Sequence, residues 1–134
     1  MKFSTTLIAA AVLTLAAGAA GAQTPAGYPA DYAKIIEGAK KEGKLVIYSA
    51  TDSKAAEPLI KDFSALYPGV KVEYNDMNST EVYNRFISEA AAGGATADLM
   101  WSSAMDLQVK LVSDGYGLAY KSPEGAAVPT WPSC

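Results

Sequence analysis

Hydroxyl and amide side chains gather in three short segments of the sequence where chemistry could occur. Each segment follows an apolar run and precedes a helix-like pattern, and the candidate ligand-binding residues are Ser49, Thr51, Asn78, Ser79, Ser102 and Ser103. These side chains donate and accept hydrogen bonds, and the first amides of a following helix would add donors at the positive end of the helix dipole. The combination suits a polar or anionic small molecule that carries oxygen atoms.

The same residue types also suit a structural role. Ser, Asn and Asp before a helix are ordinary capping residues, so Ser53, Asn78 and Ser103 could each act only as a cap. Tyr48 and Trp101 end two apolar runs and could stack on a ligand, although packing in the core is the more common role. Three such segments close together would favour a binding site, so the binding role and the structural role both stay open.

Catalytic patterns are missing from the sequence. The chain has no His, and Ser102 and Ser103 lack a G-x-S-x-G frame, so no ordinary triad can be assembled. Asp52 and Asp76 could pair for acid–base work, although capping or solvation is more usual for such carboxylates. We therefore expect no enzyme and no cofactor. The lack of His also argues against a metal site made by this chain alone.

Alternating helix and strand patterns would position the three polar segments. Apolar spacing predicts helices over residues 31–42, 56–67, 78–93 and 103–115, and strands over residues 45–48, 70–74 and 99–101. Asp31, Asn78 and Ser103 are the predicted caps, the last two with an acidic residue three positions later. Pro58 fits the second helix only in its first turn. Residues 118–120 could add a short extended piece.

The element order predicts the fold class. Strands that alternate with helices of this length imply parallel strands joined by right-handed crossovers, with helices on both faces of the sheet. We therefore predict an α/β fold with an open, mostly parallel sheet of three or so strands. The strand over residues 70–74 alternates apolar and charged residues and should lie near an edge. Loops at the carboxyl ends of such strands converge on one edge, where ligands bind.

The first residues have the three parts of a secretory signal peptide. Lys2 is positively charged, residues 7–15 are apolar, and residues 20–22 are small, as a cleavage site requires. The apolar run is shorter than the roughly 20 residues that span a membrane. We predict a signal peptide over residues 1–22, a periplasmic domain over residues 23–134, and no membrane insertion after cleavage.

Charge and cysteine content limit the partners. The formal net charge is −3 and becomes −4 when Lys2 is removed, and the chain has no basic run, so nucleic acid is a poor partner. Anionic membranes are disfavoured for the same reason. The only Cys is Cys134, so no disulfide can form within the chain.

Four segments together resemble the start of periplasmic solute-binding proteins of ABC importers. They are, in chain order, residues 42–49 (EGKLVIYS), 63–72 (FSALYPGVKV), 97–101 (ADLMW) and 122–124 (SPE). Each segment alone is a weak pattern, but their order and spacing are rather specific and cover nearly the whole mature chain. The group that they resemble most is the type 2 binding fold related to ferric-iron-binding proteins.

The resemblance implies two α/β lobes that hold a solute between them and release it to a membrane permease. Residues 23–134 would form a partial first lobe, and the six loop residues named at the outset would supply its side of the site. Iron-binding relatives take Tyr ligands from the second lobe, and some add a His, which this chain lacks. Ferric iron, phosphate, phosphonate, carboxylate and polyamine solutes therefore all stay open.

Family members of this kind are much longer, so the resemblance also predicts a copy truncated within the first lobe. The third strand should then present an unpaired edge. The alternative function is a truncated product that binds no solute, or an interaction module that pairs with another chain through the exposed sheet edge.

Overall fold

The computed structural model describes residues 24–94 and 97–127 and has the predicted α/β architecture. Its elements are α1 (Tyr32–Glu42), β1 (Lys44–Ser49), α2 (Ser53–Leu66), β2 (Lys71–Asp76), α3 (Ser79–Ala91), β3 (Leu99–Trp101), α4 (Met105–Ser113) and the 3-10 helix η1 (Pro123–Ala126). The predicted signal peptide and Cys134 lie outside the described residues. None of the described helices has the length and apolar character that crossing a membrane requires.

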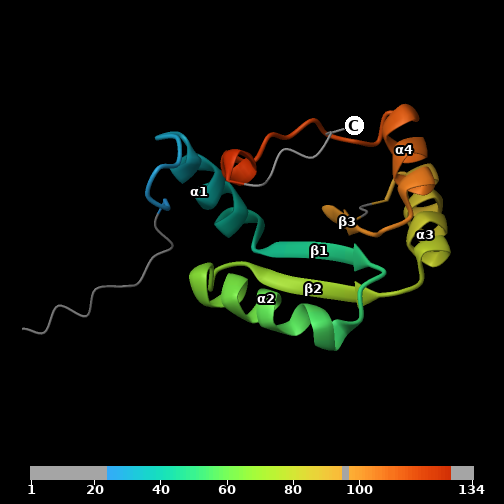
Figure 1. Ribbon diagram of the computed structural model, residues 1–134, viewed down its shortest axis with the longest axis horizontal. Coiled ribbons are helices and arrows are strands. Elements are labelled where there is room, and N and C mark those ends of the chain that lie inside the picture. Colours follow the sequence, from blue (N-terminus) through green and yellow to red (C-terminus); the bar gives the residue numbers. More distant parts are fainter. Residues whose placement is uncertain (1–23, 95–96, 128–134) are drawn as a thin grey trace, which may run out of the picture.

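The described strands form one parallel sheet in the order β2-β1-β3. β1 is the central strand, since its residues from Lys44 to Ser49 pair with β2 and its last three residues pair with β3. β2 therefore lies at an edge, as its alternating charges predicted. Figure 1 shows β1 and β2 running together, with α2 along β2 and with α3 and α4 near the carboxyl ends of the strands.

Helices cover both faces of the sheet, as predicted. Alternation along β1 places Leu45, Ile47 and Ser49 on one face and Val46 and Tyr48 on the other. α1 and α2 pack on the first face, where side chains from both helices line a common groove with Leu45. α3 packs on the second face, where it contacts Tyr48.

The core is small and lies where these helices meet the sheet. The buried side chains come from all four α-helices, from β1 and from the turn before β2: Ile36, Ile47, Tyr48, Ser49, Ala56, Val70, Val82, Phe86 and Leu111. A groove of about 530 Å³ lies between α3, β3, α4 and the segment after α4. Large apolar side chains along this groove stay exposed, including Leu118 at 92%.

α2 begins earlier than predicted. Its first residue is Ser53, because the Asp52 carboxylate accepts a hydrogen bond from the Lys54 amide and fixes the start of the helix. Pro58 consequently lies in the second turn, so the prediction that it occupies the first turn is wrong. Proline has no amide to donate to the Lys54 carbonyl, but Pro58 is exposed and its ring faces solvent.

Only one of the predicted helix caps acts as one. Asn78 forms a capping box, in which its Oδ1 accepts from the Glu81 amide at 3.0 Å and Glu81 accepts from the Asn78 amide at 2.9 Å. Asp31 occupies the cap position of α1 without a side-chain cap bond. Ser103 is not a cap, because α4 starts one residue later than its spacing predicted and Ala104 takes that position.

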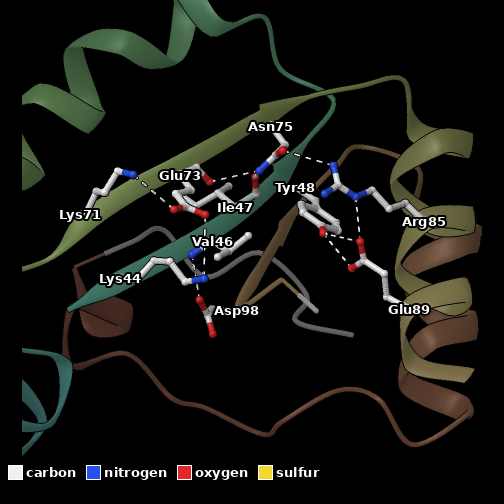
Figure 2. Close-up of polar contacts among 10 residues, drawn as sticks. All are labelled: Lys44, Val46, Ile47, Tyr48, Lys71, Glu73, Asn75, Arg85, Glu89 and Asp98. Carbon is white, nitrogen blue, oxygen red and sulfur yellow. Dashed lines mark hydrogen bonds and ion pairs between the residues drawn. The ribbon is translucent and has the colours of Figure 1, made fainter. Parts of the chain in front are cut away.

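Asp98 sets the register of β3 against β1. Its amide donates to the Val46 carbonyl at 2.9 Å, and its carboxylate accepts from the Val46 amide at 2.8 Å, so a side chain replaces a backbone acceptor in the ladder. Figure 2 shows the carboxylate below Val46. The short strand that follows has the predicted bounds. Residues 118–120, by contrast, form no strand.

Candidate functional site

The three polar loops meet at the carboxyl edge of the sheet and are joined by hydrogen bonds. The Ser49 hydroxyl donates to the Trp101 carbonyl at 3.1 Å and links the loops after β1 and β3. The Met77 amide donates to the Ser49 carbonyl at 2.9 Å and links the loops after β2 and β1. The geometry that parallel strands require therefore brings the predicted loops into one place.

Ser49 lies beneath this edge and not on it. Its side chain is 0% exposed, donates to Trp101, and accepts from the Thr51 amide at 3.0 Å. Both functions of the hydroxyl are thus occupied inside the protein. The Thr51 carbonyl in turn accepts from the Tyr74 hydroxyl at 2.7 Å, so this loop is held from two sides.

Ser79 and Ser102 form a direct contact between two of the loops. The Ser102 hydroxyl donates to the Ser79 hydroxyl at 3.1 Å and accepts from the Ala104 amide at 3.1 Å. The Gln108 side chain donates to the Ser102 carbonyl. The first residue of α3 is thereby attached to the loop that leads into α4.

Thr51 and Ser103 provide hydroxyls that the described part of the chain leaves unpaired. Thr51 is partly buried and Ser103 is exposed, and neither hydroxyl has a hydrogen-bond partner among residues 24–94 and 97–127. A solute that reaches this edge would find them available.

The amino ends of α2 and α3 both point to this edge but differ in what occupies their amides. Asp76 Oδ2 accepts from the Ser53 amide at 2.8 Å and from its hydroxyl at 3.0 Å, while Asp52 accepts from Lys54. Two carboxylates therefore close the amino end of α2. They serve as caps, and nothing in their contacts makes them an acid–base pair.

At the start of α3 the cap is the uncharged Asn78 side chain. The amides of Ser79 and Thr80 have no acceptor within the described residues. The amino end of α3 is thus a place on this edge where open amide donors lie beside the hydroxyls of Ser79 and Ser102 and the positive end of a helix dipole.

A polar cluster behind the edge was missed by sequence reasoning. Tyr48 donates from its hydroxyl to both oxygens of Glu89, at 2.9 and 2.8 Å, and Arg85 Nε donates to Glu89 at 2.9 Å. The Arg85 guanidinium also lies 4.4 Å from the centre of the Tyr48 ring. Figure 2 shows the three side chains between α3 and the sheet. The sequence signal was the spacing of Arg85 and Glu89, four residues apart on one helix.

This cluster shifts the ionisation of its members. Hydrogen bonds from Arg85 and then from Tyr48 lower the pKa of the Glu89 carboxyl. Burial, followed by the hydrogen bond to Glu89, raises the pKa of Tyr48. The bond to Glu89 raises the pKa of Arg85. Glu89 is therefore held as a carboxylate between a cation and a neutral phenol.

Metal ligands are not clustered in the part of the chain that the structure describes. Among residues 24–94 and 97–127, no group of three or more His, Cys, Asp or Glu side chains is placed to hold a metal ion.

Comparison with known proteins identifies the family of this chain. Residues 48–129 match the family of bacterial extracellular solute-binding proteins. The chain belongs to this family. A search of curated proteins gives no match. The resemblance to solute-binding proteins seen in the sequence is therefore confirmed at the level of the family.

One solved structure shows how much of a solute-binding protein the chain represents. It is the substrate-binding protein of an ABC transporter from Agrobacterium tumefaciens, with 43% sequence identity and a TM-score of 0.61. The match covers 68% of this chain and 27% of that protein. The chain thus spans 27% of the length of the protein that it resembles.

Proposed function

We propose that this chain is a part of the extracytoplasmic solute-binding component of an ABC importer and captures a small polar or anionic solute for a membrane permease. Family membership and the likeness to a transporter's substrate-binding protein support this role. The observation that carries it is the open amino end of α3, where Ser79 meets Ser102 at the carboxyl edge of the sheet.

Five of the six predicted residues would contact the solute. Thr51, Ser79, Ser102 and Ser103 offer hydroxyls, and Asn78 keeps its side-chain NH₂ group while its oxygen caps α3. Ser49 would act from below by holding the Thr51 amide and the Trp101 carbonyl. Its buried hydroxyl therefore shapes the site without touching the solute.

The chemistry of this edge favours oxygen-bearing solutes. Open amides and hydroxyls at the positive end of the α3 dipole would bind a phosphate, phosphonate or carboxylate group. A polyamine would have to rely on Asp52 and Asp76, whose oxygens already accept amides of α2. Ferric iron is supported least, since it favours anionic oxygen ligands and the carboxylates of this edge, Asp52, Asp76 and Glu81, already accept backbone amides.

The setting of the site follows from the same assignment. Residues 1–22 would export the chain to the periplasm, and residues 23–134 would form part of the first of two lobes. The relation to ferric-iron-binding proteins and the expected truncation stay predictions.

Thermal unfolding of the purified chain with a set of solutes tests the proposal. Inorganic phosphate, methylphosphonate, citrate, spermidine and ferric citrate would each be added separately. A solute that binds, added at a free concentration of about 100 times its Kd, should raise the free energy of unfolding by about 2.7 kcal/mol.

Matched serine substitutions show whether a stabilising solute binds at this edge. Ser79→Ala should weaken the effect, whereas Ser88→Ala, at an exposed position near the other end of α3, should not. A stabilising solute whose effect is the same in both variants would bind elsewhere and would overturn the site. If no solute stabilises the chain, solute capture by this part of the protein is contradicted.

A further inference from the structure

We propose that Arg85 is a positioning residue for solute binding, which braces α3 so that its amino end stays against the loop after β3. The inference rests on the proposed function in one respect only, namely that the solute binds at this end of α3. The positioning itself is a property of the solute-free protein.

Arg85 connects α3 to the central and edge strands at once. Its guanidinium lies over the ring of Tyr48 on β1, and its Nη1 donates to Asn75 Oδ1 at 3.2 Å and lies 4.0 Å from the sulfur of Met77. Glu89, one turn further along α3, accepts from both Arg85 and Tyr48. The helix is therefore attached to the sheet by two successive turns.

The residues that Arg85 contacts are those from which α3 starts. Asn75 is the next-to-last residue of β2, and its side chain also donates to the Ile47 carbonyl at 3.4 Å. The Met77 amide donates to the Ser49 carbonyl. Arg85 thus bonds back to the segment that leads into α3, and Ser79 lies between the two bonded residues in the sequence.

The position of Ser79 depends on the direction of α3. Its hydroxyl accepts from Ser102 at 3.1 Å, a contact near the upper length for hydroxyl pairs, so a small rotation of the helix would break it. Burial of Val82 and Phe86 is a non-directional attraction, so by itself it holds α3 on the sheet and leaves the helix some freedom of direction. A guanidinium with directional donors removes that freedom.

Arginine suits this role better than lysine. Its planar group stacks on an aromatic ring while its separate nitrogens donate in different directions, and a lysine ammonium cannot do both. Arg85→Lys should therefore keep the charge near Glu89 but lose the simultaneous contacts to Tyr48 and Asn75.

Hydrogen exchange in the solute-free, full-length chain tests the positioning directly. In the first turn of α3, the Glu81 amide donates to the Asn78 side chain and the Val82 amide donates to the Asn78 carbonyl. Exchange at these two amides therefore reports on the capping geometry of α3. In Arg85→Gln these amides should exchange about tenfold faster, and Arg85→Lys should recover only part of the protection.

Lys110→Gln is the matched control. It removes an i,i+4 ion pair of similar geometry, Lys110 with Asp114 at 2.8 Å, from α4. It should leave exchange in the first turn of α3 unchanged. If Arg85→Gln lowers only the unfolding temperature, with first-turn exchange equal to that of the control, Arg85 merely stabilises the fold and the proposal is wrong.

Solute affinity separates this inference from the proposed function. If phosphate or citrate stabilises the wild type, Arg85→Gln should weaken its binding about tenfold, although Arg85 lies outside the contact set. Unchanged affinity would overturn the positioning role. If no probe stabilises the wild type, the proposed function fails, and the exchange measurement still decides whether Arg85 positions α3.

Discussion

The helices α2 and α3 start at the same edge of the sheet, pack on opposite faces, and differ in how many of their first amides are bonded. The amides at the start of α2 are closed by the carboxylates of Asp52 and Asp76. Those at the start of α3 are capped by the neutral Asn78, with the hydroxyl of Ser102 close by. Two carboxylates thus bond the first amides of α2, whereas at α3 the single carboxylate of Glu81 bonds the amide of the cap residue and leaves the next two amides open.

This difference teaches that position alone does not make a binding site. Both helix ends satisfy the rule that ligands bind at the carboxyl edge of parallel strands. The α3 end keeps the amides of Ser79 and Thr80 open, whereas the first amides of α2 are bonded to carboxylates. The two helices are alike in packing, since the fourth residue of each helix is buried, as Ala56 in α2 and Val82 in α3.

The largest expected effects come from these two packing positions. Val82 is 1% exposed, so Val82→Ala should lower the free energy of unfolding by about 2 kcal/mol through lost burial and a cavity. Ala56 is 0% exposed, so Ala56→Val should also destabilise, by about 1 to 3 kcal/mol, because the extra methyl groups have no space.

Urea unfolding of both variants measures the two costs. A value near zero for Ala56→Val would mean that α2 approaches the sheet loosely, and the contrast in how the two helix ends are held would have to be redrawn. Leu59→Ala, at an exposed position of α2, is the control for the effect of a substitution in this helix that changes no buried contact.

Giving α3 the kind of cap that α2 has tests the contrast in charge. Asn78→Asp preserves the cap acceptor but adds a carboxylate where the open amides lie. We expect it to reduce the affinity for an anionic solute about tenfold, which corresponds to about 1.4 kcal/mol, while stability is kept. Calorimetric titration with the solute found in the thermal screen measures the change. Equal affinity in the variant would place the anion away from α3.

Much of the fold could be predicted from the sequence because its signals are local and repeated. Apolar runs bounded by Gly and Pro gave the strands, and the bounds of β3 were predicted correctly from Leu99 to Trp101. The capping box of Asn78 and Glu81 was predicted correctly for the same reason, since both partners lie within one helical turn.

The misses come from local side-chain bonds that shift a helix start and from contacts between distant segments. The spacing of Ser103 and Asp106 imitates a capping box, but the Ser102 hydroxyl accepts the Ala104 amide and delays the start of α4. The start of α2 is fixed by the local cap Asp52 and also by Asp76, which lies 23 residues beyond Ser53 and accepts from its amide. The Arg85 cluster joins α3 to two strands, and no local pattern reveals which ring the guanidinium meets.

Removing each cap separately should give a smaller effect than the packing changes. Asn78→Ala should cost about 1 kcal/mol of unfolding free energy, because the Glu81 amide loses its side-chain acceptor, while the backbone amide at position 78 can still donate to Glu81. Asp52→Ala should cost less, since Asp76 still accepts from the Ser53 amide and hydroxyl. Thermal unfolding of the two variants and of their double variant measures the costs. A larger loss for Asp52→Ala would show that Asp76 does not share the capping of α2.

The smallest expected effect is a pH dependence that belongs to α3 and not to α2. Hydrogen bonds from Arg85 and Tyr48 lower the folded-state pKa of Glu89 below its ordinary value of 4.5. A carboxyl with a lowered pKa contributes stability that is present above the unfolded-state pKa and is lost as the pH falls through the folded-state pKa. Acid should therefore loosen α3 first.

Glu89→Gln isolates this contribution. The variant should lose stability at neutral pH, and its unfolding free energy should fall less steeply with acid than that of the wild type. Glu57→Gln, at an exposed position of α2, controls for the removal of a surface carboxylate. Urea unfolding at a series of pH values from neutral to acid gives the slopes. If the two variants have the same slope, Glu89 does not couple protonation to folding. The attachment of α3 would then rest on apolar packing, as that of α2 does.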